Sequence, residues 1–207
     1  MKQFSKKINF STLLLFFSFL LYSQEQGAIR LGVNLDLAIP NAGFGTGGNL
    51  DLRYNILDKL NAGLKIGSLY GVHDVVKNQS ELTGTLTASI INSYLITSDY
   101  YFNNTESILA PFVGGGFGLF NVSNLKLALT EKPTYSNLVN FDRDTKIGGL
   151  IRCGIEISKI RLGLEYFLIP QSNLYNITNA NVEVTKNSYF NISLGFYLGG
   201  GKWNNKY

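Results

Sequence analysis

Apolar and polar residues alternate one by one along eight segments of the chain. The clearest segment runs from Ile29 to Ile39, where Ile, Leu and Val alternate with Arg, Gly, Asn, Asp and Ala. Because successive side chains of a β-strand point to opposite faces, this period of two predicts a strand with one apolar and one polar face. The other predicted strands cover residues 49–56, 60–70, 86–102, 109–120, 147–157, 160–168 and 190–199.

The connections between these segments alternate strictly between longer and shorter. They are predicted at residues 40–48, 57–59, 71–84, 103–107, 121–146, 158–159 and 170–187. A transmembrane β-barrel has short turns at its periplasmic end and longer loops outside the cell, whereas a soluble up-and-down barrel needs no such asymmetry. The sequence therefore predicts an all-β fold, an eight-stranded antiparallel up-and-down transmembrane β-barrel.

The content of the polar face indicates which way the side chains point. It consists mostly of Gly, Asn, Ser and Thr, whereas the outer surface of a soluble lipocalin-type barrel would carry many scattered charges. Five basic and five acidic residues lie on it, which suits a closed lumen because buried charge is costly unless it is paired. A solvated face with charges balanced by chance remains the alternative. The predicted interior network consists of Arg30, Asp36, Asp51, Arg53, Lys65, Asp99, Arg152, Glu156, Arg161 and Glu165.

The overall composition agrees with a membrane barrel. Charged residues make up only 15% of the chain, below the roughly 25% of soluble domains, while Tyr and Phe together number 26 and Pro only 4. Eight strands enclose an interior just wide enough for side chains to fill, so no large open pore is expected. Aromatic residues near the predicted strand ends suit the girdles found at both membrane interfaces: Tyr54, Tyr100, Phe102 and Phe196 at one end, Tyr70 and Phe190 at the other.

The first 23 residues are predicted to be a cleaved signal peptide, and residues 24–207 to form the barrel. Three lysines precede an uncharged stretch rich in Leu and Phe, and Ser23-Gln24 follows it. An uncleaved membrane anchor is the alternative, although the strongly apolar core of about ten residues is short for a span of ~20. Removal of this segment takes three of the 18 basic residues and none of the 14 acidic ones, which leaves 15 and 14 and a net charge of about +1. Binding of nucleic acid is therefore not expected.

The sequence offers little chemistry for catalysis. His73, the single histidine, is followed by Asp74 in a predicted loop, and no serine is placed with this pair. Cys153, the single cysteine, suits a buried or lipid-facing position, and one His with one Cys cannot form a usual metal site. The glycine clusters at 43–48 and 114–118 neither open a helix nor continue into Lys-Ser/Thr, so they predict a loop and a closely packed strand instead of a phosphate site. No catalytic residue, cofactor or metal is expected.

Two adjacent segments resemble a known family. Tyr94–Phe102 (Tyr-Leu-Ile-Thr-Ser-Asp-Tyr-Tyr-Phe) is followed by Pro111–Gly118 (Pro-Phe-Val-Gly-Gly-Gly-Phe-Gly). This order is similar to that of outer-membrane β-barrel domain proteins of Bacteroidetes, including PorT-like ones, and to small barrels of the OmpX and OmpA kind. The resemblance implies a barrel and an outer-membrane location, and it implies no particular activity. The chain departs from the general outer-membrane pattern after Trp203, although it keeps a terminal aromatic, Tyr207.

These observations together predict a non-enzymatic barrel of the bacterial outer membrane. Its expected role is structural, adhesive or accessory to envelope assembly, and its expected partners are membrane lipid and extracellular ligands or envelope proteins that contact loops 71–84, 121–146 and 170–187. Two alternatives stay open at this point. One is a lipid-modifying enzyme that uses His73 or Asp74, and the other is a soluble periplasmic barrel that binds a small apolar ligand.

Overall fold

The computed structural model describes residues 26–40, 43–73, 84–102, 109–129, 140–175, 181–185 and 187–199. Across these ranges the regular secondary structure is β-strand. They include no helix with the length and apolar character needed to cross a membrane. The predicted signal peptide and the predicted connection 103–107 lie outside the described residues. So do residues 74–83, 130–139, 176–180 and 186 of the predicted loops.

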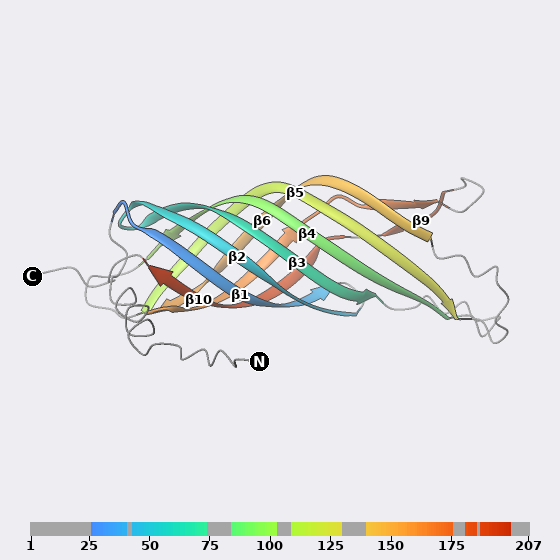
Figure 1. Cartoon of the computed structure of the whole chain (residues 1–207), viewed down its shortest axis with the longest axis horizontal. Helices are drawn as coiled ribbons and strands as arrows, with labels where there is room; N and C mark the ends of the chain where they lie inside the picture. Colours follow the sequence, from blue (N-terminus) through green and yellow to red (C-terminus); the bar gives the residue numbers. More distant parts are fainter. Residues whose placement is uncertain are drawn as a thin grey trace, which may run out of the picture.

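Eight strands close into one antiparallel barrel, as predicted (Figure 1). Consecutive strands pair from β1 to β7, and β10 closes the barrel by pairing with both β7 and β1. The strands run obliquely around the barrel, as closure of a sheet requires. Their bounds are β1 Ile29–Pro40, β2 Phe44–Leu57, β3 Leu60–His73, β4 Gly84–Tyr101, β5 Leu109–Leu129, β6 Asn140–Ile157, β7 Ile160–Leu168 and β10 Tyr189–Gly199.

The barrel has two different ends. At one end, here called the turn end, two-residue turns join β2 to β3 and β6 to β7, and β1 starts and β10 finishes there. At the other, the loop end, the segment between β7 and β10 contains an additional hairpin, β8 Ser172–Tyr175 paired with β9 Asn181–Thr185. Asn187, which follows this hairpin, is hydrogen-bonded to the residues at its start. Its side-chain amide donates to Pro170 O (2.7 Å) and to Ser172 Oγ (2.9 Å).

The predicted connections are wrong at three loop-end positions. β2 begins at Phe44, so the connection predicted at 40–48 shrinks to three residues, and the cluster 43–48 is mostly strand. β5 and β6 continue into the segment predicted as loop 121–146, and the hairpin β8–β9 occupies part of 170–187. His73, predicted in a loop, ends β3, where it is the register partner of Thr87. Backbone pairing with a neighbouring strand extends these strands through glycine and polar residues that show no clear alternation of their own.

The apolar face of every barrel strand points outward. Along β1, residues Ile29 to Ile39 alternate between exposed apolar and buried positions, and Leu35 is 69% exposed. The same arrangement holds for Leu52 on β2, Leu194 on β10 and Cys153 on β6. The buried face of each strand lines a lumen that is filled with side chains, so the core of this protein lies inside the barrel.

Glycines on the inner face make room for the largest side chains of the lumen. At Gly114 an added Cβ would lie 2.0 Å from Asp99 Oδ1 and 2.5 Å from Ser98 O, whereas at Gly163 it would meet nothing closer than 3.8 Å. Both are inner positions of the barrel, but only the first is sterically closed. The glycine cluster 114–118 therefore acts in close packing, as the sequence indicates.

We expect Gly114→Ala to destabilise the folded barrel by about 1–3 kcal/mol, since an extra methyl in a filled core forces its neighbours to move. Gly163→Ala should change the stability little. Urea unfolding in lipid vesicles, followed by the gel mobility of folded and unfolded forms, measures both. Equal stability of the two variants would contradict the close packing at Gly114.

Candidate functional site

The lumen is divided into three layers along the barrel axis. The middle layer, here called the charged layer, is formed by Asp51, Arg53, Asp99, Arg152 and Arg161. It lies between a turn-end layer, which contains Tyr101, Ala110 and Phe112, and an apolar loop-end layer. The loop-end layer consists of Ala38, Leu69, Ile91, Leu95, Phe120, Val122, Leu150, Phe167, Ile169 and Tyr189. All ten charged residues predicted for the interior lie inside the barrel, and each is at most 9% exposed.

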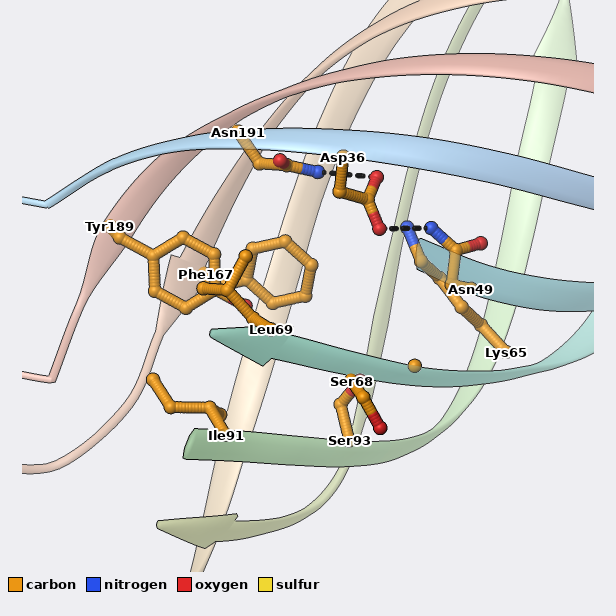
Figure 2. Close-up of a pocket in the computed structure, with 11 residues that line it drawn as sticks. Asp36, Asn49, Lys65, Ser68, Leu69, Ile91, Ser93, Phe167, Tyr189 and Asn191 are labelled. Carbon is orange, nitrogen blue, oxygen red and sulfur yellow. Dashed lines mark hydrogen bonds between the residues drawn. The ribbon is translucent and has the colours of Figure 1, made fainter. Parts of the chain in front are cut away.

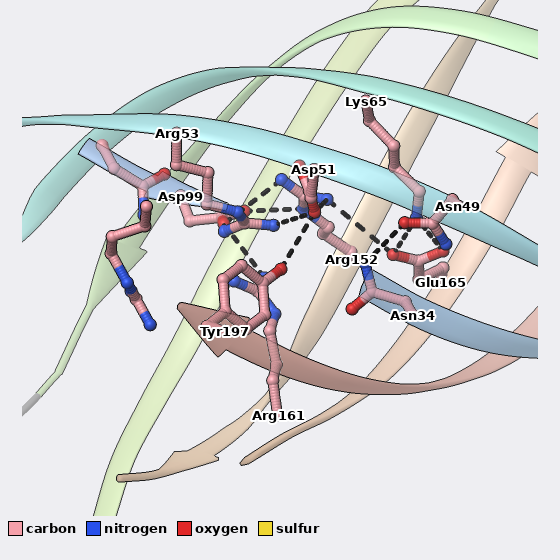
Figure 3. A network of polar contacts seen from close by, with 12 residues as sticks. Asn34, Asn49, Asp51, Arg53, Lys65, Asp99, Arg152, Arg161, Glu165 and Tyr197 are labelled. Carbon is pink, nitrogen blue, oxygen red and sulfur yellow. Dashed lines mark hydrogen bonds and ion pairs between the residues drawn. The ribbon is translucent and has the colours of Figure 1, made fainter. Parts of the chain in front are cut away.

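Asp99 is the centre of the charged layer (Figure 3). Its carboxylate accepts hydrogen bonds from Arg152 (2.7 Å from Nε to Oδ1) and from Arg161 (2.9 Å from Nη2 to Oδ2), and it pairs with Arg53 as well. These residues come from four different strands, β4, β6, β7 and β2. Three guanidinium groups converge on one carboxylate because Asp99, on β4, faces them across a narrow lumen.

Asp51 and Tyr197 complete this cluster. Asp51 pairs with Arg53, lies 3.5 Å from Arg152 Nη1 and accepts a hydrogen bond from the Tyr197 hydroxyl (3.0 Å). The Tyr197 ring has guanidinium carbons on its faces, at 5.2 Å for Arg53 and 5.8 Å for Arg161. Cation–π attraction of this kind is strongest where water is excluded, so Tyr197 offsets part of the excess positive charge.

Two further carboxylates lie between the charged layer and the loop-end layer. Glu165 accepts from Lys65 Nζ with both oxygens, at 2.5 and 2.6 Å. Asp36 accepts from the side-chain amides of Asn49 (2.6 Å) and Asn191 (2.9 Å), and it has no ion pair among the described residues. Asn191 also donates to Glu165 (3.0 Å), so its amide links the two carboxylates.

At the turn end, Arg30 pairs with Glu156, which also accepts a hydrogen bond from Tyr101 (3.0 Å). Lys159, in the turn between β6 and β7, donates to Gly199 O (2.9 Å). Partial burial, with the nearby Arg30 guanidinium, lowers the pKa of the Lys159 amine. Ion pairs and aromatic rings thus close the lumen on this side.

The sequence prediction expected a polar interior, so it does not include the aromatic rings of the turn-end layer and the loop-end layer. A signal for them exists where three apolar residues follow one another, because the middle one points inward when the outer two face lipid. Tyr100-Tyr101-Phe102 and Tyr166-Phe167-Leu168 are such runs, and the structure buries Tyr101 in the turn-end layer and Phe167 in the loop-end layer. The prediction assigned apolar residues to lipid and overlooked these inward rings.

This arrangement holds charges in place but offers no reactive group. Each of the network carboxylates is engaged by cations or amides, and the described residues contain no cluster of three His, Cys, Asp or Glu side chains suited to a metal. Asp74 and the side chain of His73 lie outside what the structure describes. What the network can do is stabilise a closed lumen, since buried ions are tolerated when they are paired and hydrogen-bonded.

A closed barrel with an apolar outside and a charged inside defines the class of transmembrane β-barrel proteins, because in lipid every backbone polar group must be paired and the surface must be apolar. No protein-family model matches the sequence, and no curated protein does.

Several solved outer-membrane proteins are similar in structure. Neisserial surface protein A shares 16% identity over 83% of this chain and 95% of its own, with a TM-score of 0.44. The outer membrane protein OprG from Pseudomonas aeruginosa shares 11% identity over 87% and 100%, with a TM-score of 0.48. Ail, the attachment invasion locus protein of Yersinia pestis, shares 14% over 84% and 100%, with a TM-score of 0.38.

Proposed function

We propose that this protein is a non-enzymatic barrel of the bacterial outer membrane that passes no solute and acts through its surface. The observation that carries the proposal is the combination of an apolar outer wall with a lumen closed by three successive layers of side chains. A soluble ligand-binding barrel needs the reverse, with apolar residues around an open cavity. A porin needs a lumen wide enough for water to pass, which eight strands do not provide.

The loop end offers the surface through which such a protein would act. β4, β5 and β6 extend further at this end than their neighbours, and the hairpin β8–β9 stands beside them (Figure 1). This asymmetry supports a structural, adhesive or envelope-assembly role. The strand extensions, the hairpin and the connections within residues 71–84, 121–146 and 170–187 would be the contacts for extracellular ligands or envelope proteins. Lipid of the outer membrane would surround the rest.

Two parts of the proposal come from the sequence alone. Cleavage of residues 1–23 would deliver residues 24–207 to the outer membrane. Membership of the Bacteroidetes barrel family, including PorT-like proteins, is supported by the similarity of residues 94–118. The alternative of a lipid-modifying enzyme depends on His73 and Asp74, and no contact among the described residues adds to it.

The test is to purify the protein from the membranes of an expressing bacterium. We expect it in the outer-membrane fraction, starting near Gln24, with different gel mobility before and after boiling. Reconstituted in planar bilayers, it should show no porin-like conductance, because the charged layer and both aromatic layers block the lumen. Recovery in the soluble periplasmic fraction, or steady passage of sugars into vesicles, would contradict the proposal.

A further inference from the structure

Two small cavities adjoin in the loop half of the lumen and share Leu69, Ile91 and Tyr189 as walls. The outer cavity reaches Ser89 and Asn187 near the loop end. The inner one continues to the boundary of the charged layer. Each leaves about 10 Å³ in which the centre of a water molecule can lie, which is about the least that a cavity needs to hold one water.

The inner cavity has polar groups that the protein itself leaves incompletely bonded (Figure 2). Asn191 lines it, and Asn191 Oδ1 is buried and accepts no hydrogen bond from the part of the chain that the structure describes. Lys65 also lines it, and its ammonium has three N–H groups, whereas Glu165 is its one hydrogen-bond partner among the described residues. Buried polar groups of native proteins are bonded to protein or to ordered water, so these groups require a small partner.

The charges around the cavity decide the nature of that partner. The Lys65 ammonium opposes a cation, and the Asp36 carboxylate opposes an anion. A neutral molecule that both donates and accepts hydrogen bonds satisfies both sides, and only one of water's size fits. We propose that the inner cavity is a binding site for an ordered water molecule, which donates to Asn191 and accepts from Lys65.

The cavity exists because β3 and β4 have small inward-facing residues at this level. Gly67 on β3 is the register partner of Ser93 on β4, and both line the inner cavity. A Cβ at Gly67 would lie 3.1 Å from Ser93 Oγ and 3.0 Å from Asn49 Cβ, so a methyl there would take up the space of the water. The lumen is thus closed to solutes and yet hydrated from the loop end.

The experiment is NMR of the folded full chain in lipid nanodiscs, observing Overhauser transfer from water to side-chain amide protons. Asn34 is the internal control, because it is 3% exposed, against 2% for Asn191, and lines neither cavity. We expect water cross-peaks at Asn191 and none at Asn34. Gly67→Ala should remove the Asn191 signal, and Gly163→Ala, which adds the same methyl elsewhere in the lumen, should keep it.

Three outcomes would overturn the proposal: no water signal at Asn191 in the wild type, equal signals at Asn34 and Asn191, or a signal that persists in Gly67→Ala. A shift of the Asn191 resonances on titration with NaCl or KCl would replace water by a cation and overturn it too. If Gly67→Ala fails to show the gel mobility of a folded barrel, Ser93→Val fills the same cavity from the neighbouring strand and is judged by the same criteria.

Discussion

Asp99→Asn should destabilise the barrel by about 3–5 kcal/mol, the range found when one partner of a buried ion pair is removed. Asp99 is 1% exposed and is contacted by Arg53, Arg152 and Arg161. The amide keeps the shape of the carboxylate but not its charge, so three buried guanidinium groups would lose the carboxylate that they share. Asp51 would remain beside Arg53 and Arg152, and Glu156, at 4.0 Å, beside Arg161. The midpoint of urea unfolding in lipid vesicles, read from gel mobility, measures the loss.

The chain offers a matched control in Asp144, which pairs with Lys146 at 2.6 Å near the loop end but has a side chain that is 44% exposed. Asp144→Asn should cost no more than about 1 kcal/mol, since water screens an exposed pair. A loss at Asp99 no larger than the loss at Asp144 would show that the charged layer is not desolvated.

Removal of a nearby cation should restore part of the stability that Asp99→Asn loses. The cluster of Asp51, Asp99 and three arginines has a net charge of +1, which Asp99→Asn raises to +2. Adding Arg161→Met returns it to +1, so the double variant should be more stable than Asp99→Asn alone. Such non-additivity is expected for residues that share one network.

Leu35→Arg should cost about 2–4 kcal/mol of stability in lipid vesicles, the penalty for a cation on the lipid face near the bilayer midplane. Leu35 lies on the outer face near the middle of β1, among exposed apolar residues on both sides along the strand. In a soluble barrel the same change would place a charge in water and cost almost nothing. The variant therefore tests whether the outer face of the barrel contacts lipid or water. The same urea-unfolding assay measures the effect.

Two controls separate charge from position. Leu35→Met keeps an apolar side chain of similar volume and should cost less than 1.5 kcal/mol. Thr145→Arg places the same cation on the outer face of β6, beyond the last exposed isoleucine, Ile147, and should cost about 0–1 kcal/mol. Equal penalties at positions 35 and 145 would mean that no apolar layer of lipid surrounds the wall at Leu35.

The two experiments examine opposite faces of the same strands. If both losses appear, stability depends on paired charge inside and apolar contact with lipid outside, and the loop end remains free to vary. That division suits a protein whose role is carried by its surface, since substitutions in the loops would leave the barrel intact.

The sequence by itself determined the eight strands, their antiparallel order and the faces of their side chains. Alternation along β1 from Ile29 to Ile39 is a local property, because a strand directs each side chain opposite to the next one whatever its neighbours are. The two-residue turn at Ser158 and Lys159 was likewise readable, since two alternating segments meet there. For the same reason the alternation alone identifies the ten charged residues of the lumen.

Only the tertiary structure decided which of these charges meet. Arg30 and Glu156 are 126 residues apart, and Lys65 and Glu165 are 100 apart, so their pairing depends on how the strands are staggered when the barrel closes. Closure also decided that the connection after Pro40 is short and that β5 and β6 extend beyond the ends predicted for them. These features depend on contacts between strands, which a pattern along one strand does not contain.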